Sequence, residues 1–265
     1  MTTPSGREVD SGTDTVLGRV AEGVGVIELN RPDSRNALHP DMYDAIPRLI
    51  EAYDRDGEVG CVLVTAAGPA FCAGGDVRQG TGRRGDGDEA AVLTRLARMV
   101  VMLRESPKIS IAALPGPAVG AGLGLALAAD LRIAAASATL IGGWSRLAFS
   151  GDFGGAWLLT RMLGPARALE FLIGTEPIDA GAGERLGLFN RVVADDRLHD
   201  AALSWAREIA AGPRGAYALM KENVRDAQAM GLREALPRES ERMVRSGRSR
   251  EHREALRRWG AGRRR

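Results

Sequence analysis

Short apolar segments alternate with helical patterns along the first half of the chain, and this alternation constrains the fold more than any other feature. Runs of Val, Ile, Leu and Ala with the length of strands occur at 16–20, 24–29, 61–65, 109–114, 131–135 and 139–141. Apolar residues at helical spacing lie between them, over 39–54, 88–105 and 121–129. From residue 154 onward the spacing predicts helices alone. The pattern predicts an α/β fold followed by a helical C-terminal region.

Composition divides the chain of 265 residues into three parts. Residues 1–14 are rich in Ser, Thr, Gly and Asp and are predicted to be disordered. Residues 15–195 form the predicted α/β core, and residues 196–265 form the helical region. The net charge is only +2, so nucleic acid is not an expected partner, although arginines crowd toward residues 263–265.

Cysteine usage and hydropathy predict a cytoplasmic protein. The two cysteines, Cys61 and Cys72, lie in apolar runs and suggest no disulfide framework. We find no signal peptide and no uninterrupted apolar stretch near the roughly 20 residues that cross a bilayer. The three histidines lack the spacing of metal ligands, so no metal site is expected.

Two glycine-rich segments, 71–76 and 120–124, are candidates for an anion-binding site. The second opens a helix, whose first amides are unpaired and attract negative charge. The turn at Gly74 and Gly75 offers another backbone amide, and two amides that converge on one carbonyl oxygen make an oxyanion hole. Tight helix packing without a ligand is the plain alternative. A dinucleotide fingerprint is disfavoured, because the glycine spacing does not fit it.

The segment 144–155, WSRLAFSGDFGG, holds a single carboxylate, Asp152, among apolar residues and glycines. The flanking rings of Phe149, Phe153 and Trp157 are expected to desolvate this carboxylate and to raise its pKa. Asp152 is therefore a candidate for proton transfer. Two alternatives remain open: it acts as a nucleophile, or it only caps the helix that begins near Gly154.

Several segments together resemble the motifs of the crotonase (enoyl-CoA hydratase/isomerase) superfamily. They run in order over about residues 15 to 259 and lie at 30–38, 70–76, 118–130, 181–193 and 251–255. The resemblance implies a spiral of ββα units with a C-terminal helical region for trimerisation, often as a dimer of trimers. It also implies an acyl-CoA thioester as substrate and chemistry that needs no cofactor.

The resemblance also assigns roles to single residues. The thioester carbonyl is expected between the amides of Gly75 and Ala121, which match the family's oxyanion hole. Further residues are expected to line the substrate site. They would contact CoA, lie next to the hole or line the acyl pocket, and they are Arg35, Ala37, Leu38, Ala73, Gly74, Asp76, Gly120, Trp144 and Phe149.

The chain departs from the family's hydratases at both catalytic glutamates, which fall on Gly124 and Trp144. The resemblance therefore favours isomerisation, in which Asp152 carries a proton between carbons. One alternative is an enzyme similar to 4-chlorobenzoyl-CoA dehalogenase, or a hydrolytic enzyme, with Asp152 as nucleophile and Trp144 eight residues before it. Another is a homologue that binds a thioester or RNA without catalysis.

Overall fold

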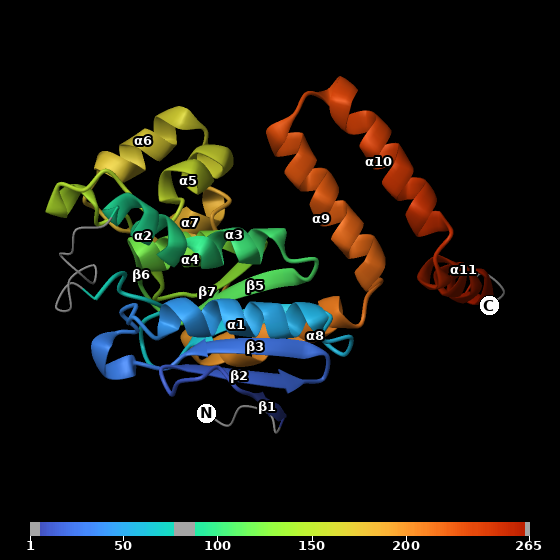
Figure 1. Ribbon diagram of the computed structural model, residues 1–265, viewed down its shortest axis with the longest axis horizontal. Helices are drawn as coiled ribbons and strands as arrows, with labels where there is room; N and C mark the ends of the chain where they lie inside the picture. Colours follow the sequence, from blue (N-terminus) through green and yellow to red (C-terminus); the bar gives the residue numbers. More distant parts are fainter. Residues whose placement is uncertain (1–5, 77–87, 263–265) are drawn as a thin grey trace.

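The strands of the computed structural model, which describes residues 6–76 and 88–262, form two sheets (Figure 1). The larger sheet has seven strands in the order β1-β2-β3-β4-β5-β7-β10, and the smaller has three in the order β6-β8-β9. The strands are β1 (Arg7–Val9), β2 (Val16–Ala21), β3 (Val24–Leu29), β4 (Cys61–Ala66), β5 (Ile109–Leu114), β6 (Ala118–Val119), β7 (Leu131–Ala135), β8 (Thr139–Ile141), β9 (Ile178–Asp179) and β10 (Arg191–Val193).

Helices pack on the larger sheet and make up most of the C-terminal third. They are α1 (Met42–Arg55), α2 (Glu89–Leu96), α3 (Arg98–Glu105), α4 (Ala121–Ala128), α5 (Gly155–Leu163), α6 (Pro165–Ile173), α7 (Ala180–Arg185), α8 (Leu198–Ala210), α9 (Arg214–Ala229), α10 (Leu232–Gly247) and α11 (Arg250–Gly262). None of these described helices is long and apolar enough to cross a membrane.

The larger sheet is parallel from β3 to β10 and antiparallel at β1 and β2. β2 and β3 form the predicted hairpin, whose turn places Glu22 and Gly23 at positive φ, as a tight two-residue turn requires. The inner strands are continuous apolar runs because helices cover the sheet. In Figure 1, α1 lies in front of the strands and α8 lies behind them, in contact with β3, β4, β5 and β7.

Two expectations from the sequence are wrong because they miss strands. Residues 6–14 are ordered, since β1 pairs with β2 and the buried Ser11 hydroxyl hydrogen-bonds the carbonyl oxygens of Thr13 and Val16. The expectation of helices alone beyond residue 154 misses β9 and β10. These strands have two and three residues, which is too short for any periodicity to reveal.

Two helices also differ from expectation in detail. The single helix expected over 88–105 is interrupted at Ala97, which separates α2 from α3. The helix expected over 39–54 runs from Met42 to Arg55 and continues through Pro47, which is buried against the core.

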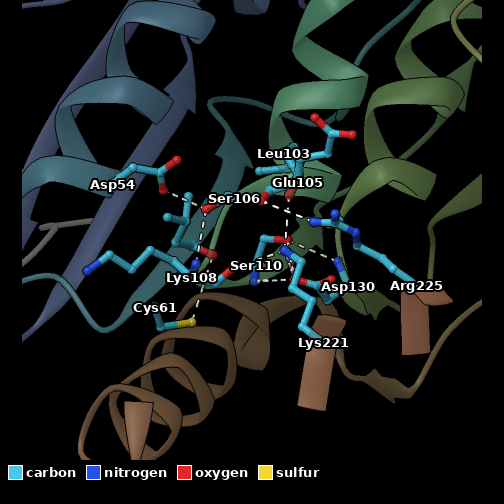
Figure 2. A network of polar contacts seen from close by, with 12 residues as sticks. Asp54, Cys61, Leu103, Glu105, Ser106, Lys108, Ser110, Asp130, Lys221 and Arg225 are labelled. Carbon is cyan, nitrogen blue, oxygen red and sulfur yellow. Dashed lines mark hydrogen bonds and ion pairs between the residues drawn. The ribbon is translucent and has the colours of Figure 1, made fainter. Parts of the chain in front are cut away.

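The three C-terminal helices α9, α10 and α11 extend from the body of the molecule as an arm (Figure 1). Lys221 is the buried residue of α9, and its Nζ donates to Asp130 Oδ2 at 2.8 Å. The same ammonium group donates to the carbonyl oxygens of Leu103 and Lys108, while Ser110 donates to Asp130 (Figure 2). Burial lowers the pKa of Lys221. An ion pair between the buried Lys221, which uses all three of its donors, and the partly buried Asp130 therefore attaches the arm to the core.

We expect Lys221→Met to weaken this attachment far more than Arg225→Met, a change one turn further along α9. Loss of Lys221 leaves the carboxylate of Asp130 without its cation, which costs about 3–5 kcal/mol for a buried pair. Arg225 makes only a 3.4 Å exposed contact with the Glu105 carbonyl oxygen. Urea unfolding and amide hydrogen exchange over 214–229 measure the difference. Equal effects of the two substitutions would contradict the assigned role of the pair.

Every residue of α4 is buried, and its glycines permit backbones to approach closely. A Cβ atom at Gly124 would lie 2.5 Å from the carbonyl oxygen of Phe153. That space is occupied by backbone, which a side chain displaces only at a cost.

Gly124→Ala is expected to destabilise the protein by about 1–3 kcal/mol, although alanine is the better helix former. Gly247→Ala in α10 is the matched control, because a Cβ atom there meets no atom within 4 Å. The control is expected to be neutral or to gain up to about 1 kcal/mol. Denaturant melts that give both variants the same stability would disprove the steric argument.

Candidate active site

Three segments that are distant in sequence lie side by side next to the smaller sheet. Leu38 pairs with Gly75 and donates its amide to the Gly74 carbonyl oxygen at 2.7 Å. Cys72 pairs with Ala118, at the start of β6, and β6 pairs in turn with β8. The structure thus brings together the predicted site segments 35–38, 73–76 and 120–121.

The two predicted oxyanion donors lie where these segments meet. Gly120 has φ 53° and directs the chain into α4, whose first amide is that of Ala121. A Cβ atom at Gly74, where φ is 91°, would lie only 3.7 Å from the Ala121 nitrogen. Neither the Gly75 nor the Ala121 amide donates a hydrogen bond to another described residue. Two unpaired amides from separate loops are therefore held close to each other.

A tight contact between α4 and the first loop fixes this arrangement. A Cβ atom at Gly122 would lie 2.6 Å from the Cβ, carbonyl oxygen and Sγ atoms of Cys72. Burial raises the pKa of the Cys72 thiol to about 12, so it stays protonated. Cys72 serves in packing and not as a nucleophile.

Asp152 is positioned by a hydrogen bond from Trp144. The indole Nε1 donates to Asp152 Oδ1 at 2.7 Å, and Trp144 is itself buried. A Cβ atom at Gly120 would lie 3.9 Å from the same Nε1, so the acid is held beside the start of α4. Burial raises the pKa of Asp152, while the bond from Trp144 opposes that rise. The cap of α5 is Gly154, with no side-chain bond, so the capping role considered for Asp152 is wrong.

The expected sources of desolvation are only partly right. Phe153 is 4% exposed, but Phe149 is 63% exposed and Trp157 is 47% exposed. The Trp157 ring faces the guanidinium groups of Arg104 and Arg161 instead. Trp144 takes the place expected for the other rings. The exposed Phe149 does not desolvate Asp152, and its place along the acyl pocket stays a prediction.

At the two positions where the resemblance places the hydratase glutamates, Gly124 has no space for a side chain and Trp144 carries an indole. The backbone of Phe153 fills the space beside Gly124, and the indole of Trp144 fills the space above Gly155, 2.4 Å from where a Cβ atom there would lie. Asp152 therefore lies beside the donors without a second acid at either position.

Two predicted substrate-binding residues have different surroundings. The Asp76 carboxylate is paired with Arg31 at 3.3 Å, and Arg31 also donates to the Ala37 carbonyl oxygen. This pair holds the segment 37–38 against the loop 73–76. The Arg35 side chain is exposed, while its carbonyl oxygen accepts from the Ala73 amide.

Tyr43 belongs to the site but was not predicted from the sequence. Its ring lies 6.0 Å from that of Phe153, measured between centroids. Burial raises the pKa of its hydroxyl to about 12, and the nearby carboxylates of Asp152 and Asp76 add to the effect. In the sequence, Tyr43 lies next to the apolar stripe of α1. This position is the only indication in the sequence that its side chain could lie beside the site.

Residues 19–262 match the family model described as enoyl-CoA hydratase/isomerase. The chain is 32% identical over 244 residues to 1,2-epoxyphenylacetyl-CoA isomerase of Escherichia coli strain K12, covering 91% of this chain and 93% of that protein. It is 27% identical over 230 residues to 4-chlorobenzoyl coenzyme A dehalogenase-2 of Arthrobacter sp, covering 85% and 83%. The crystal structure of an enoyl-CoA hydratase from Polaromonas sp. JS666 superposes with a TM-score of 0.88 at 31% identity, covering 93% and 97%. The chain therefore belongs to the enoyl-CoA hydratase/isomerase family and has the crotonase fold.

Proposed function

We propose that this protein isomerises an unsaturated acyl-CoA by moving a proton on a thioester enolate. The observation that carries the proposal is the desolvated Asp152, held by Trp144 beside the unpaired amides of Gly75 and Ala121. An acid with a raised pKa next to preorganised donors is the combination that proton abstraction beside a carbonyl requires.

The chemistry follows from this geometry. The thioester oxygen accepts hydrogen bonds from both amides, which makes the α-carbon more acidic. Asp152 takes the α-proton, the electrons of the C–H bond form the enolate, and the hole holds the negative charge. Asp152 then returns the proton to the γ-carbon as the double bond moves next to the carbonyl. Each amide of such a hole stabilises the transition state by about 3 kcal/mol.

The chain's departures from a hydratase favour isomerisation over hydration. Hydration by two carboxylates needs one acid to activate water and another to protonate carbon, and positions 124 and 144 supply neither. Double-bond migration needs a single group that takes and returns a proton, which Asp152 provides. The similarity to an isomerase of a CoA thioester supports the same class of reaction and substrate.

A nucleophilic Asp152 is the second candidate, because the Trp144–Asp152 hydrogen bond would also orient a carboxylate for attack. The similarity to a 4-chlorobenzoyl-CoA dehalogenase supports it. The carboxylate would bond to the ring carbon, halide would leave, and water would hydrolyse the resulting ester. The raised pKa of Asp152 favours the proton-transfer role.

We also propose that the arm mediates self-association into trimers or dimers of trimers in the cytoplasm. Its exposed apolar side chains support an interface: Met220, Val224, Leu232, Leu236, Met243, Val244, Leu256 and Trp259. The free, buried cysteines suit a reducing compartment.

Asp152→Asn is expected to lower kcat by about 10²–10⁴-fold on a 3-enoyl-CoA while thioester binding stays nearly unchanged. Product analysis separates the reactions, since isomerisation keeps the mass, hydration adds water and dehalogenation exchanges halide for hydroxyl. The exposed Asp196→Asn is the matched control. Unchanged turnover in Asp152→Asn would remove this residue from the mechanism.

The same variant separates a catalytic role from a structural one. The pKa of Asp152 is raised in the folded state, so ionisation weakens the fold as pH rises through that pKa. Asparagine removes this penalty. The melting temperature of Asp152→Asn at neutral pH should therefore equal or exceed that of the wild type. A marked fall would point to a structural role instead.

Trp144→Phe should move the rising limb of the pH profile of kcat/KM to higher pH. The indole hydrogen bond stabilises the ionised carboxylate, so its removal raises the pKa of Asp152 further. Trp157→Phe makes the same chemical change at a half-exposed residue and should leave the limb in place. A limb that stays in place, or moves to lower pH, in Trp144→Phe would contradict the assignment of Asp152 as the base.

A further inference from the structure

Tyr43 lies on the side of the site formed by the beginning of α1. This helix begins four residues after Leu38, the residue that pairs with the oxyanion loop. The Tyr43 ring leans on Phe153 at 6.0 Å and 37°, next to the catalytic acid Asp152. Trp144 thus bonds Asp152 directly, while Tyr43 packs on the next residue, Phe153, from a different element.

The Tyr43 hydroxyl differs from that of Tyr53 on the same helix. Tyr53 is fully buried, donates to the Val26 carbonyl oxygen at 2.6 Å and accepts from the Arg19 amide at 2.9 Å. Tyr43 is half-buried, and its hydroxyl makes no hydrogen bond with any residue in 6–76 or 88–262. Packing and its hydrogen bonds account for the Tyr53 hydroxyl, whereas the half-exposed Tyr43 hydroxyl is left to bond with water or with a ligand.

The surroundings of Tyr43 decide what it can bind. With a pKa of about 12, the hydroxyl keeps its proton at physiological pH and is available as a hydrogen-bond donor. Asp152 places negative charge near it, which disfavours an anionic ligand group, while the charge of Asp76 is balanced by Arg31. A neutral oxygen is therefore the matching acceptor.

We propose that Tyr43 determines acyl-group specificity: its hydroxyl donates a hydrogen bond to a neutral oxygen atom carried by the acyl chain of the CoA thioester. The residue selects thioesters whose acyl group bears a hydroxyl, carbonyl or ether oxygen over plain hydrocarbon chains of the same length. This inference rests on the proposed function, since it requires an acyl-CoA in the site.

Two thioesters of equal chain length test the idea: butyryl-CoA, which lacks the oxygen, and 3-hydroxybutyryl-CoA, which carries it. Isothermal titration measures the binding of each to the wild type, to Tyr43→Phe and to Tyr217→Phe. Tyr217 is a half-buried tyrosine on α9 and serves as the matched control. Tyr43→Phe should lower the affinity for 3-hydroxybutyryl-CoA about three- to tenfold, which is the contribution of one neutral hydrogen bond.

Binding of butyryl-CoA should be unchanged in Tyr43→Phe, and Tyr217→Phe should bind both thioesters as the wild type does. If Tyr43→Phe lowered the affinity for both thioesters equally, or for neither, the specificity role would be overturned while the proposed function would stand. A wild-type protein that binds neither thioester would overturn the proposed function itself, and this inference with it.

Discussion

The contact between α4 and the loop that contains Cys72 is the constraint on which the site depends. Gly122 allows the helix to approach Cys72 so closely that a single added carbon would lie 2.6 Å from its side chain and its carbonyl oxygen. Cys72 is also paired with Ala118, so helix and loop are joined on both sides of Gly120. The unpaired amides of Gly75 and Ala121 owe their proximity to this contact. The proposed oxyanion hole would therefore be a consequence of core packing, with its two amides in place before any substrate binds.

The same packing bears on which carboxylates lie near the proposed hole, where Asp76 is paired with Arg31 and Asp152 is bonded to Trp144. The chain around Phe153 fills the space at Gly124, and the indole of Trp144 occupies the second hydratase position. Asp152 is half-buried beside Trp144. Burial raises its pKa and the indole hydrogen bond limits that rise, so the acid stays ionisable in a site where its charge is costly.

The sequence predicts the parts of the structure that leave a local pattern. Buried strands such as 61–65 are continuous apolar runs, the turn at Glu22 and Gly23 has its own residue signature, and the glycines of α4 indicate close packing. Features that depend on distant partners leave no such pattern. Strand β10 is only three residues long and exists because β7 offers an edge, and the exposure of Phe149 depends on how the loop after β8 turns. Tyr43 enters the site only because Phe153 packs beside it.

The most direct test of the account is exchange of the α-proton of a saturated thioester, because it isolates enolate formation from any later step. Butyryl-CoA incubated with the wild-type protein in heavy water should incorporate deuterium at the α-carbon, as followed by proton NMR, and Asp152→Asn should not catalyse the exchange. The account would be contradicted if the wild type bound the thioester without exchange, or if exchange continued undiminished without the carboxylate of Asp152.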